Sequence, residues 1–406
     1  MTTVPRPTAA PLPAAGEVRP FVPQVDADDV VDLRRRLAAT RWPEEATQPG
    51  DAQGLPLVDL QRLVAYWHEG YDFDRLAHRL SSAPQVRVEV DGLTQHALHV
   101  RSSRTDAVPL LLAHGWPSTC FDFLDLLSGL TDPVVGPAFH VVAPSLPGYG
   151  YADRPAEPGW GIERTADAWV ALMEALGHPT FLVHGGDWGA VVATAMARRH
   201  PDRVRGLHLT IPVSAATPED RAEASEAERR GLAREDEYRR SGYAYAQVQR
   251  TRPQTLGYSL VDSPVGLCAW VAEKLLAWSD RHADGTSLIS DDDVLDVVSI
   301  YWLTATGASA ARLYREVDWR AQLAPVEVPT ACSIFPAEII RPPRSAVARQ
   351  YGGLCSWREP DRGGHFPALE VPDLLTEELR TFGRLVEGLE TSPVFGQANS
   401  CEGVRQ

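Results

Sequence analysis

The chain has 406 residues, of which 44% are hydrophobic and 23% are charged, a composition typical of a globular protein. Its formal net charge of −15 disfavours nucleic acid and anionic membrane surfaces as partners, so a small molecule is the expected ligand. Five scattered cysteines favour neither a disulfide framework nor a zinc site, and they fit a reducing cytoplasm. Oligomeric state stays open, with a homodimer as the alternative to a monomer.

The two ends of the chain differ from its middle in composition. Residues 1–20 are rich in proline and alanine and contain no signal-like or membrane-spanning apolar run, so we expect a flexible leader and no membrane anchor. Residues 391–406 are polar and predict a loose tail. Residues 21–85 carry apolar side chains at three- and four-residue intervals, which predicts an N-terminal helical segment.

The middle of the chain predicts an α/β core in two parts, residues 86–212 and 329–390. Alternating residues around Asp91-Gly92 indicate an antiparallel hairpin. Apolar strand runs and a helix from Glu163 then alternate, which predicts a mostly parallel sheet with helices on both faces. Residues 213–328 interrupt this pattern and predict an inserted helical cap. Its charged stretch PEDRAEASEAERRGLAREDEYRR is typical of a solvated, salt-bridged helix, to which we assign no function.

The motif GGDWG lies where an apolar strand, TFLVH, meets a helix, AVVATAMARRH. This strand-turn-helix context is typical of a nucleophile elbow, and Asp187 occupies the nucleophile position. Glycines flank it because the sharp turn crowds the strand against the helix. For this motif taken alone, an aspartate that caps the helix is the structural alternative.

Two further motifs follow strands of the predicted core. HGWP should supply one oxyanion-hole N–H from Trp116, and Trp188, directly after the nucleophile, should supply the second. His114 in this motif is expected to be a satisfied structural histidine. Glu338 in FPAEI and His365 in RGGHF complete the order nucleophile, acid, base that the fold uses.

Taken together, HGWP, SLPGYG, GGDWG, FPAEIIRPP and RGGHFPALE resemble the motifs of microsomal-type epoxide hydrolases from about Phe21 to Val386. FVPQVDADDVVDLRRRLAATRWP resembles that family's N-terminal meander, which in relatives wraps the core and covers part of the cap. The chain departs from the family between Thr47 and Leu55, where the tryptophan-bearing motif of many relatives is missing. The resemblance implies an α/β-hydrolase fold and hydrolysis of an epoxide to a diol without metal or cofactor.

A carboxylate nucleophile suits this reaction, because an aspartate is ordinarily ionised near neutral pH and needs no base to attack. His365, oriented by Glu338, would then deprotonate the water that hydrolyses the ester. The family uses two cap tyrosines as donors to the epoxide oxygen, and YAQVQRTRP and ARLYRE match them at Tyr245 and Tyr314. Tyr243 is the alternative to Tyr245, but the spacing to Thr251-Arg252-Pro253 favours Tyr245.

Other features predict structure. The run Ser290-Asp291-Asp292-Asp293 resembles a metal site but is typical of a helix start. Aromatic core packing is expected to account for Tyr243, Tyr258, Trp270, Trp278, Tyr301 and Trp302.

The competing functions are a haloalkane dehalogenase on the same fold and a non-catalytic ligand receptor. The cap tyrosines and meander argue against the dehalogenase, and the complete triad argues against the receptor. The aromatic cap suggests a bulky, aryl-type epoxide. The composition favours a role in secondary metabolism, for example an enediyne-type pathway, over general detoxification. The breakdown of aromatic hydrocarbons is a further expected role.

Overall fold

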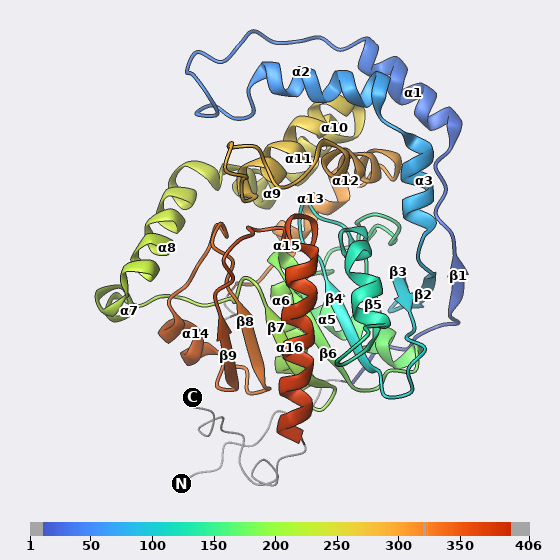
Figure 1. Cartoon of the computed structure of the whole chain (residues 1–406). Helices are drawn as coiled ribbons and strands as arrows, with labels where there is room; N and C mark the ends of the chain where they lie inside the picture. Colours follow the sequence, from blue (N-terminus) through green and yellow to red (C-terminus); the bar gives the residue numbers. More distant parts are fainter. Residues whose placement is uncertain (1–10, 320–321, 323, 391–406) are drawn as a thin grey trace.

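The computed structural model describes residues 11–319, 322 and 324–390, and a nine-stranded sheet lies at its centre (Figure 1). The strand order is β1-β2-β3-β5-β4-β6-β7-β8-β9. The first three strands and the β3–β5 pair are antiparallel, and the remaining pairs are parallel. The strands are β1 (Arg19–Phe21), β2 (Gln85–Val90), β3 (Leu93–Val100), β4 (Val108–Ala113), β5 (Phe139–Pro144), β6 (Phe181–Gly185), β7 (Val204–Leu209), β8 (Thr330–Ser333) and β9 (Leu354–Arg358). The predicted hairpin and mostly parallel sheet are confirmed.

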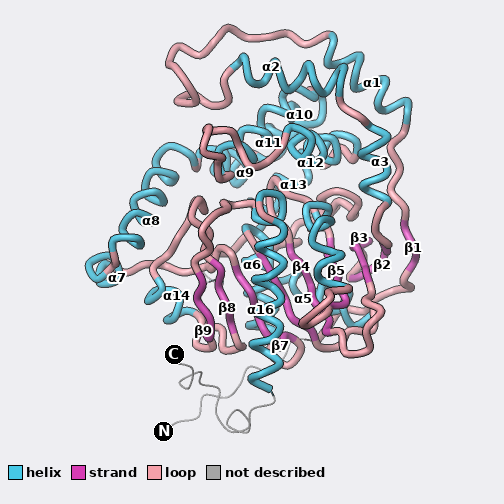
Figure 2. Tube along the Cα trace, viewed as in Figure 1, coloured by secondary structure: helices cyan, strands magenta, loops and turns pink. Residues whose placement is uncertain are grey.

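Helices cover both faces of this sheet, as Figures 1 and 2 show, because strands such as β6 are buried on both sides and must be shielded from water. On one face α5 packs against α6, and on the other α16 contacts α4 and the 3₁₀ helix η2. These core helices are η2 (Cys120–Leu126), α4 (Leu127–Thr131), α5 (Ile162–Ala175), α6 (Asp187–Arg199), α14 (Arg344–Gln350), α15 (Pro367–Glu370) and α16 (Pro372–Glu390).

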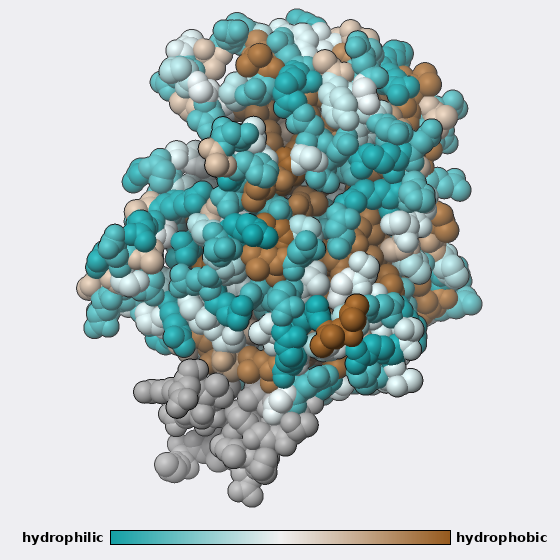
Figure 3. Space-filling view, viewed as in Figure 1, coloured by the Kyte–Doolittle hydropathy of each residue, from teal (hydrophilic) through white to brown (hydrophobic). Residues whose placement is uncertain are grey.

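Between β7 and β8 the chain forms the predicted cap, which lies above the carboxyl ends of the parallel strands (Figure 1). Apolar residues of the cap join those of the core in one hydrophobic cluster. On the face drawn in Figure 3, apolar surface is visible in the band between the cap helices and the sheet. The cap helices are α7 (Pro218–Glu223), α8 (Glu226–Glu237), the π-helix η3 (Tyr238–Gly242), α9 (Ala244–Thr251), α10 (Pro253–Asp262), α11 (Pro264–Trp278), α12 (Asp291–Leu303) and α13 (Gly307–Glu316).

The N-terminal helical segment lies across the outer side of the cap (Figure 1). Its helices are α1 (Ala27–Ala38), α2 (Leu57–Ala65), the π-helix η1 (Tyr66–Gly70) and α3 (Phe73–Ser81). Polar contacts fasten it to α12: the Trp67 indole donates to Ser299 Oγ at 2.9 Å, and the Tyr71 hydroxyl donates to Asp296 at 2.5 Å. The segment therefore holds the cap from outside, as the resemblance implied.

Three expectations need correction. The leader is not flexible up to residue 20, because β1 pairs with β2 and Ala15 bridges to Val90; residues 1–10, like the predicted tail 391–406, lie outside the described residues. The charged stretch forms α7, α8 and the start of η3 instead of one helix, because Ser225 and Glu228 form a capping box that starts a new helix at α8. Tyr258 is 69% exposed and does not pack in the core.

The acidic run at the start of α12 is a helix start, as expected. Ser290 is the N-cap and accepts a hydrogen bond from the Asp293 N–H. Asp291 pairs with Arg62 of the N-terminal segment. Within the described part of the chain, no group of three or more histidines, cysteines or acidic residues is placed to hold a metal ion. Among the same residues no single helix has the length and apolar character of a membrane span. The helices α12 and α13 meet both criteria only when taken together, and they are bent by 89° relative to each other.

Candidate active site

Asp187 lies in the tight turn between β6 and α6, with a left-handed backbone at φ 48°. The turn leaves no room for side chains at two neighbouring glycines. A Cβ on Gly185 would lie 2.4 Å from the Gly189 carbonyl oxygen, and a Cβ on Gly189 would lie 1.9 Å from the Ala113 oxygen. Strain of this kind is typical of a nucleophile elbow, which lifts the side chain to the edge of the sheet.

The loop after β4 supplies the predicted N–H donor. The Trp116 N–H donates to Asp187 Oδ1 at 2.8 Å. Trp188 is the second residue of α6, directly after the nucleophile, and donation from its N–H stays a prediction. His114 is structural, as expected, because its Nε2 accepts the Leu146 N–H at 3.0 Å and its Nδ1 lies 2.9 Å from the Gly115 carbonyl oxygen.

The predicted acid and base meet at the nucleophile. His365 Nδ1 lies 2.7 Å from Glu338 Oε1, and His365 Nε2 lies 3.3 Å from Asp187 Oδ2. The Ile339 N–H donates to the same Glu338 oxygen at 2.7 Å and fixes the carboxylate in its loop. Because Nδ1 faces a carboxylate, it carries the imidazole proton and leaves Nε2 directed at Asp187.

The electrostatics of this group favour an ion pair. Burial alone would lower the pKa of His365, but attraction to Glu338 and the contacts with Asp187 outweigh it and raise that pKa to about 10. His365 is therefore protonated near neutral pH and forms an ion pair with Asp187. Loss of the charge on Asp187 would remove one of the two carboxylates that hold this pKa high.

A cavity of about 440 Å³ opens in front of Asp187, between α6 and the cap. Tyr245 and Tyr314 both line it and are 6% and 7% exposed. Their rings flank Trp116, with Tyr245 stacked on the indole at 5.0 Å and Tyr314 edge-on at 5.9 Å between ring centroids. Burial raises the pKa of both tyrosines well above its ordinary value, with a contribution from the charge on Asp187, so both hydroxyls stay protonated and can donate.

The alternative residue Tyr243 also lines this cavity but is only partly buried. Its ring contacts Tyr245 and Tyr238 edge-on and does not stack on Trp116. Of these two tyrosines, Tyr245 is the one whose ring packs on Trp116, and its role as a donor stays a prediction.

Sequence reasoning missed several residues at this site. Tyr238, at the end of the charged stretch, lines the cavity and shares a hydrogen bond of 3.0 Å with the Tyr245 hydroxyl. Trp278 packs edge-on against His365 at 5.1 Å, and its carbonyl oxygen accepts the His365 N–H at 3.1 Å. Contacts across the cap and the core place these residues at the site. The sequence does not, because each follows the pattern of an ordinary helix residue.

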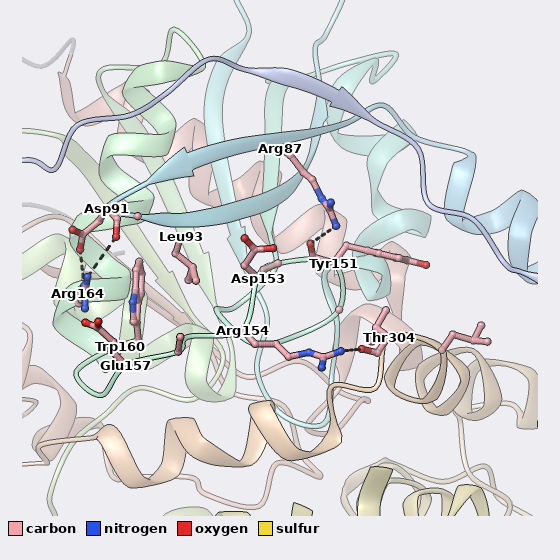
Figure 4. A pocket seen from close by; sticks show the side chains of 15 residues that line it. Arg87, Asp91, Leu93, Tyr151, Asp153, Arg154, Glu157, Trp160, Arg164 and Thr304 are labelled. Atoms are coloured by element: carbon pink, nitrogen blue, oxygen red, sulfur yellow. Dashed lines mark hydrogen bonds and ion pairs between the residues drawn. The ribbon is translucent and has the colours of Figure 1, made fainter. Parts of the chain in front are cut away.

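A larger cavity, of about 820 Å³, lies beside the β2–β3 hairpin and contains none of the triad (Figure 4). Its arginines already have partners. Arg164 pairs with Asp91, Arg87 donates to the Tyr151 carbonyl oxygen, and Arg154 donates to that of Thr304, as the dashed lines show. The candidate nucleophile Asp187 lines the smaller cavity instead.

Comparisons with known proteins agree with this geometry. A family model described as epoxide hydrolase N terminus matches residues 18–123, and one described as alpha/beta hydrolase fold matches residues 108–282. The chain is 43% identical over 369 residues to a protein of Stigmatella aurantiaca named "Putative epoxide hydrolase", covering 89% of this chain and 84% of the relative. It is 32% identical to epoxide hydrolase 1 of Sus scrofa, covering 92% and 91% of the two chains.

Solved structures give the same result. The structure of Aspergillus niger epoxide hydrolase has a TM-score of 0.83 and 31% identity, covering 93% of this chain and 97% of that one. Juvenile hormone epoxide hydrolase from the silkworm Bombyx mori has a TM-score of 0.86 and 26% identity, covering 93% and 96%. The likeness includes the N-terminal segment, the core and the cap.

Proposed function

The chain belongs to the microsomal-type epoxide hydrolase family of the α/β-hydrolase fold, and we propose that it converts an epoxide and water to a vicinal diol through an ester on Asp187. The observation that carries this proposal is the contact of Asp187 with two different groups. One carboxylate oxygen accepts the Trp116 N–H, and the other lies 3.3 Å from His365 Nε2.

In the first step, Asp187 attacks an epoxide carbon and the ring C–O bond breaks. The departing oxygen needs a donor, because an alkoxide is far more basic than a carboxylate. Tyr245 and Tyr314 supply the hydrogen bonds to that oxygen from the cap side of the cavity. Their raised pKa suits them to donate without first losing a proton to solvent.

In the second step, His365 takes a proton from water, which attacks the ester carbonyl carbon. Esterification removes the charge on Asp187, so the pKa of His365 falls. In net terms its proton neutralises the alkoxide formed in the first step, and the neutral imidazole becomes available as a base. Glu338 keeps the imidazole oriented and stabilises the imidazolium that forms. The N–H groups of Trp116 and Trp188 bind the oxyanion.

The cavity favours a bulky, aryl-type epoxide. Tyr238, Tyr243 and Trp319 add aromatic surface to the two donor tyrosines, and Ile339 and Ile340 add aliphatic surface. Aromatic walls of this kind suit an aromatic substrate that the walls bind and the tyrosines orient. A role in secondary metabolism, with an enediyne-type pathway as one example, stays a prediction.

One observation favours a second candidate, a haloalkane dehalogenase. The Trp188 indole Nε1 is buried and has no hydrogen-bond partner among the described residues, and an indole N–H of this kind can stabilise a departing halide. The two tyrosines in the same cavity favour the epoxide instead, because a halide leaves without protonation.

A direct test gives the purified protein styrene oxide and 1-bromobutane in parallel, with diol and bromide as the measured products. We expect diol from the epoxide and no bromide. Release of bromide without diol would assign the chain to dehalogenation, and neither product would favour the ligand receptor. Asp187→Ala is the control for background hydrolysis, since it removes the attacking carboxylate.

A further inference from the structure

A second, smaller cavity of about 40 Å³ lies behind the nucleophile. Among the described lining residues, Asp187 is the only one that it shares with the substrate cavity. His365, His184 and Asp122 also line it. Since roughly 10–15 Å³ of such space suffices for one water, the cavity has room for at least one between the base and the nucleophile.

Two buried polar atoms at this cavity lack hydrogen-bond partners among the described residues. They are Nε2 of His365, which lies 3.3 Å from Asp187 as an ion pair, and Oδ2 of Asp122. The other Asp122 oxygen is occupied, because it accepts from the N–H and hydroxyl of Thr119 at 3.1 Å and 2.9 Å. Buried polar groups without a protein partner are typical sites of ordered water.

A chain of hydrogen bonds sets the tautomer of His184. The Ser333 hydroxyl donates to Glu378 Oε2 at 2.7 Å, so its oxygen can only accept from His208 Nε2, 3.0 Å away. His208 therefore carries its hydrogen on Nε2 and has a bare Nδ1. His184 Nδ1 lies 3.0 Å from that atom and must carry the hydrogen of its own ring.

The result is a bare acceptor nitrogen, Nε2 of His184, on a residue that lines the cavity. Burial lowers the pKa of His184 to about 3 and holds that of His208 well below its ordinary value, so both rings stay neutral. At the other end of this series of hydrogen bonds, Arg358 pairs with Glu378 at 2.8 Å and holds Glu378 where it accepts from Ser333.

We propose that this cavity holds the water that hydrolyses the Asp187 ester, and that His184 orients this water by accepting one of its hydrogens. The proposal rests on the ester mechanism above and assigns the place and the orientation of its second reactant. Asp122 Oδ2 is a further acceptor for the water network. Because the substrate and water cavities meet at Asp187, water reaches the ester carbonyl without passing the alkyl group.

Hydrolysis of the ester uses both hydrogens of the attacking water. The water oxygen bonds to Cγ of Asp187 while His365 Nε2 takes one water proton and His184 Nε2 accepts the other hydrogen without taking it. When the tetrahedral intermediate collapses, the bond from Cγ to the alkyl oxygen breaks, and His365 returns its proton to that oxygen. The carboxyl group of Asp187 then gives the remaining water proton to His365 Nε2. The products are the diol, the Asp187 carboxylate and protonated His365, which is the ion pair from which the cycle began.

The test separates the two half-reactions. Full-length protein is mixed rapidly with styrene oxide, tryptophan fluorescence follows the reaction, and mass spectrometry after acid quench measures the fraction of protein carrying the ester. For His184→Leu we expect alkylation within about twofold of wild type, hydrolysis slowed about 10- to 100-fold, and accumulation of the ester. His184→Gln keeps an acceptor and should recover most of the hydrolysis rate.

Two further variants test whether slower hydrolysis in His184→Leu reflects misfolding instead of the loss of the acceptor. Ser333→Ala removes a hydrogen bond from the series that fixes the tautomer of His184. It should slow hydrolysis of the ester but not alkylation, by a smaller factor than His184→Leu. The matched control is His178→Leu, which removes another buried histidine, one that contacts His99 at the far end of β6, and should leave both half-reactions unchanged.

The possible failures are distinguishable. If wild type forms an ester but His184→Leu and Ser333→Ala hydrolyse it at the wild-type rate, the role of His184 is wrong and the ester mechanism stands. Equal slowing of both half-reactions would also overturn the assignment, because it would indicate a general distortion. If wild type forms no ester with any epoxide, the proposed function itself fails.

Discussion

The N–H of Trp116 donates to Oδ1 of Asp187 at 2.8 Å, so one oxygen of the proposed nucleophile is held by the proposed oxyanion donor. The other oxygen, Oδ2, is left for attack on the substrate and for the ion pair with His365. The two oxygens of Asp187 have different partners because the loop after β4 lies close to the turn that carries Asp187.

Gly115→Ala should abolish most activity, because the added Cβ would lie 2.2 Å from Asp187 Oδ1 and 2.7 Å from its Cγ. The carboxylate would have to leave the donor, and we expect kcat/KM to fall by about 100-fold or more. Steady-state diol formation measures this. Gly388→Ala adds the same methyl group where, among the described residues, no atom beyond its own turn of helix lies within 4 Å of the added Cβ, and it should retain wild-type activity. Similar losses in both variants would argue against the close approach as the cause.

Glu338→Gln should stall the second step. The charge of Glu338 is the largest influence that raises the pKa of His365, and its Oε1 fixes the proton on Nδ1 at 2.7 Å. We expect the ester on Asp187 to accumulate, with hydrolysis slowed by about 100-fold or more and alkylation much less affected. The mass of the intact protein after acid quench measures the ester. A variant that lost alkylation as strongly as hydrolysis would contradict this separation of roles.

Tyr245→Phe and Tyr314→Phe should each slow the first step, by about 10- to 100-fold, because each removes one donor to the departing epoxide oxygen. Tyr243→Phe is the matched control on the same cap segment and should remain within about threefold of wild type. Single-turnover fluorescence measures the alkylation rate. A loss at Tyr243 equal to that at Tyr314 would reassign the second donor to Tyr243.

Glu370 should make stability depend on pH. Burial raises its pKa from 4.5 to about 7, even though its oxygens accept the N–H groups of Asp280 at 2.6 Å and Phe366 at 2.8 Å. The folded protein therefore binds this proton more tightly than the unfolded chain does. The resulting stabilisation is fully present below about pH 4.5 and is lost as the pH rises through 7, an effect of up to ~3 kcal/mol.

Urea unfolding at pH 5 and pH 8 measures this contribution. Glu370→Gln cannot ionise, so its free energy of unfolding should fall less than that of wild type between the two pH values. Glu69→Gln removes a carboxylate whose side chain is 80% exposed and should keep the wild-type pH dependence. An unchanged pH dependence in Glu370→Gln would mean that this carboxyl does not carry the raised pKa.

Much of the fold was predictable, because strands buried on both faces leave continuous apolar runs and the elbow requires glycines. The triad was predictable for a related reason: each member follows its own strand, and the carboxyl ends of parallel strands meet at one edge. The error at β1 has a physical cause as well. A three-residue edge strand is held by main-chain hydrogen bonds to β2, and these leave no apolar pattern in the sequence.

The parts of the site that the sequence did not predict depend on contacts between distant residues. His184 reads as one more residue of a buried strand, and its role emerges only from its neighbours His208 and Ser333 on β7 and β8. Tyr238 lies in a charged stretch that is typical of solvated helices, yet its ring turns into the cavity. The spacing of apolar residues in the sequence does not reveal such roles, because a side chain buried among polar partners leaves no regular pattern along the chain.

The most direct test of the ester on Asp187 is a single turnover in ¹⁸O water with enzyme in excess over styrene oxide. The diol and the peptide that contains Asp187 are then analysed by mass spectrometry, with Asp187→Ala as the control that should form no diol. The mechanism predicts that the first diol carries no label and that one ¹⁸O atom appears in the carboxylate of Asp187. Label in the first diol with none in Asp187 would mean that water opens the epoxide directly, and would contradict the account.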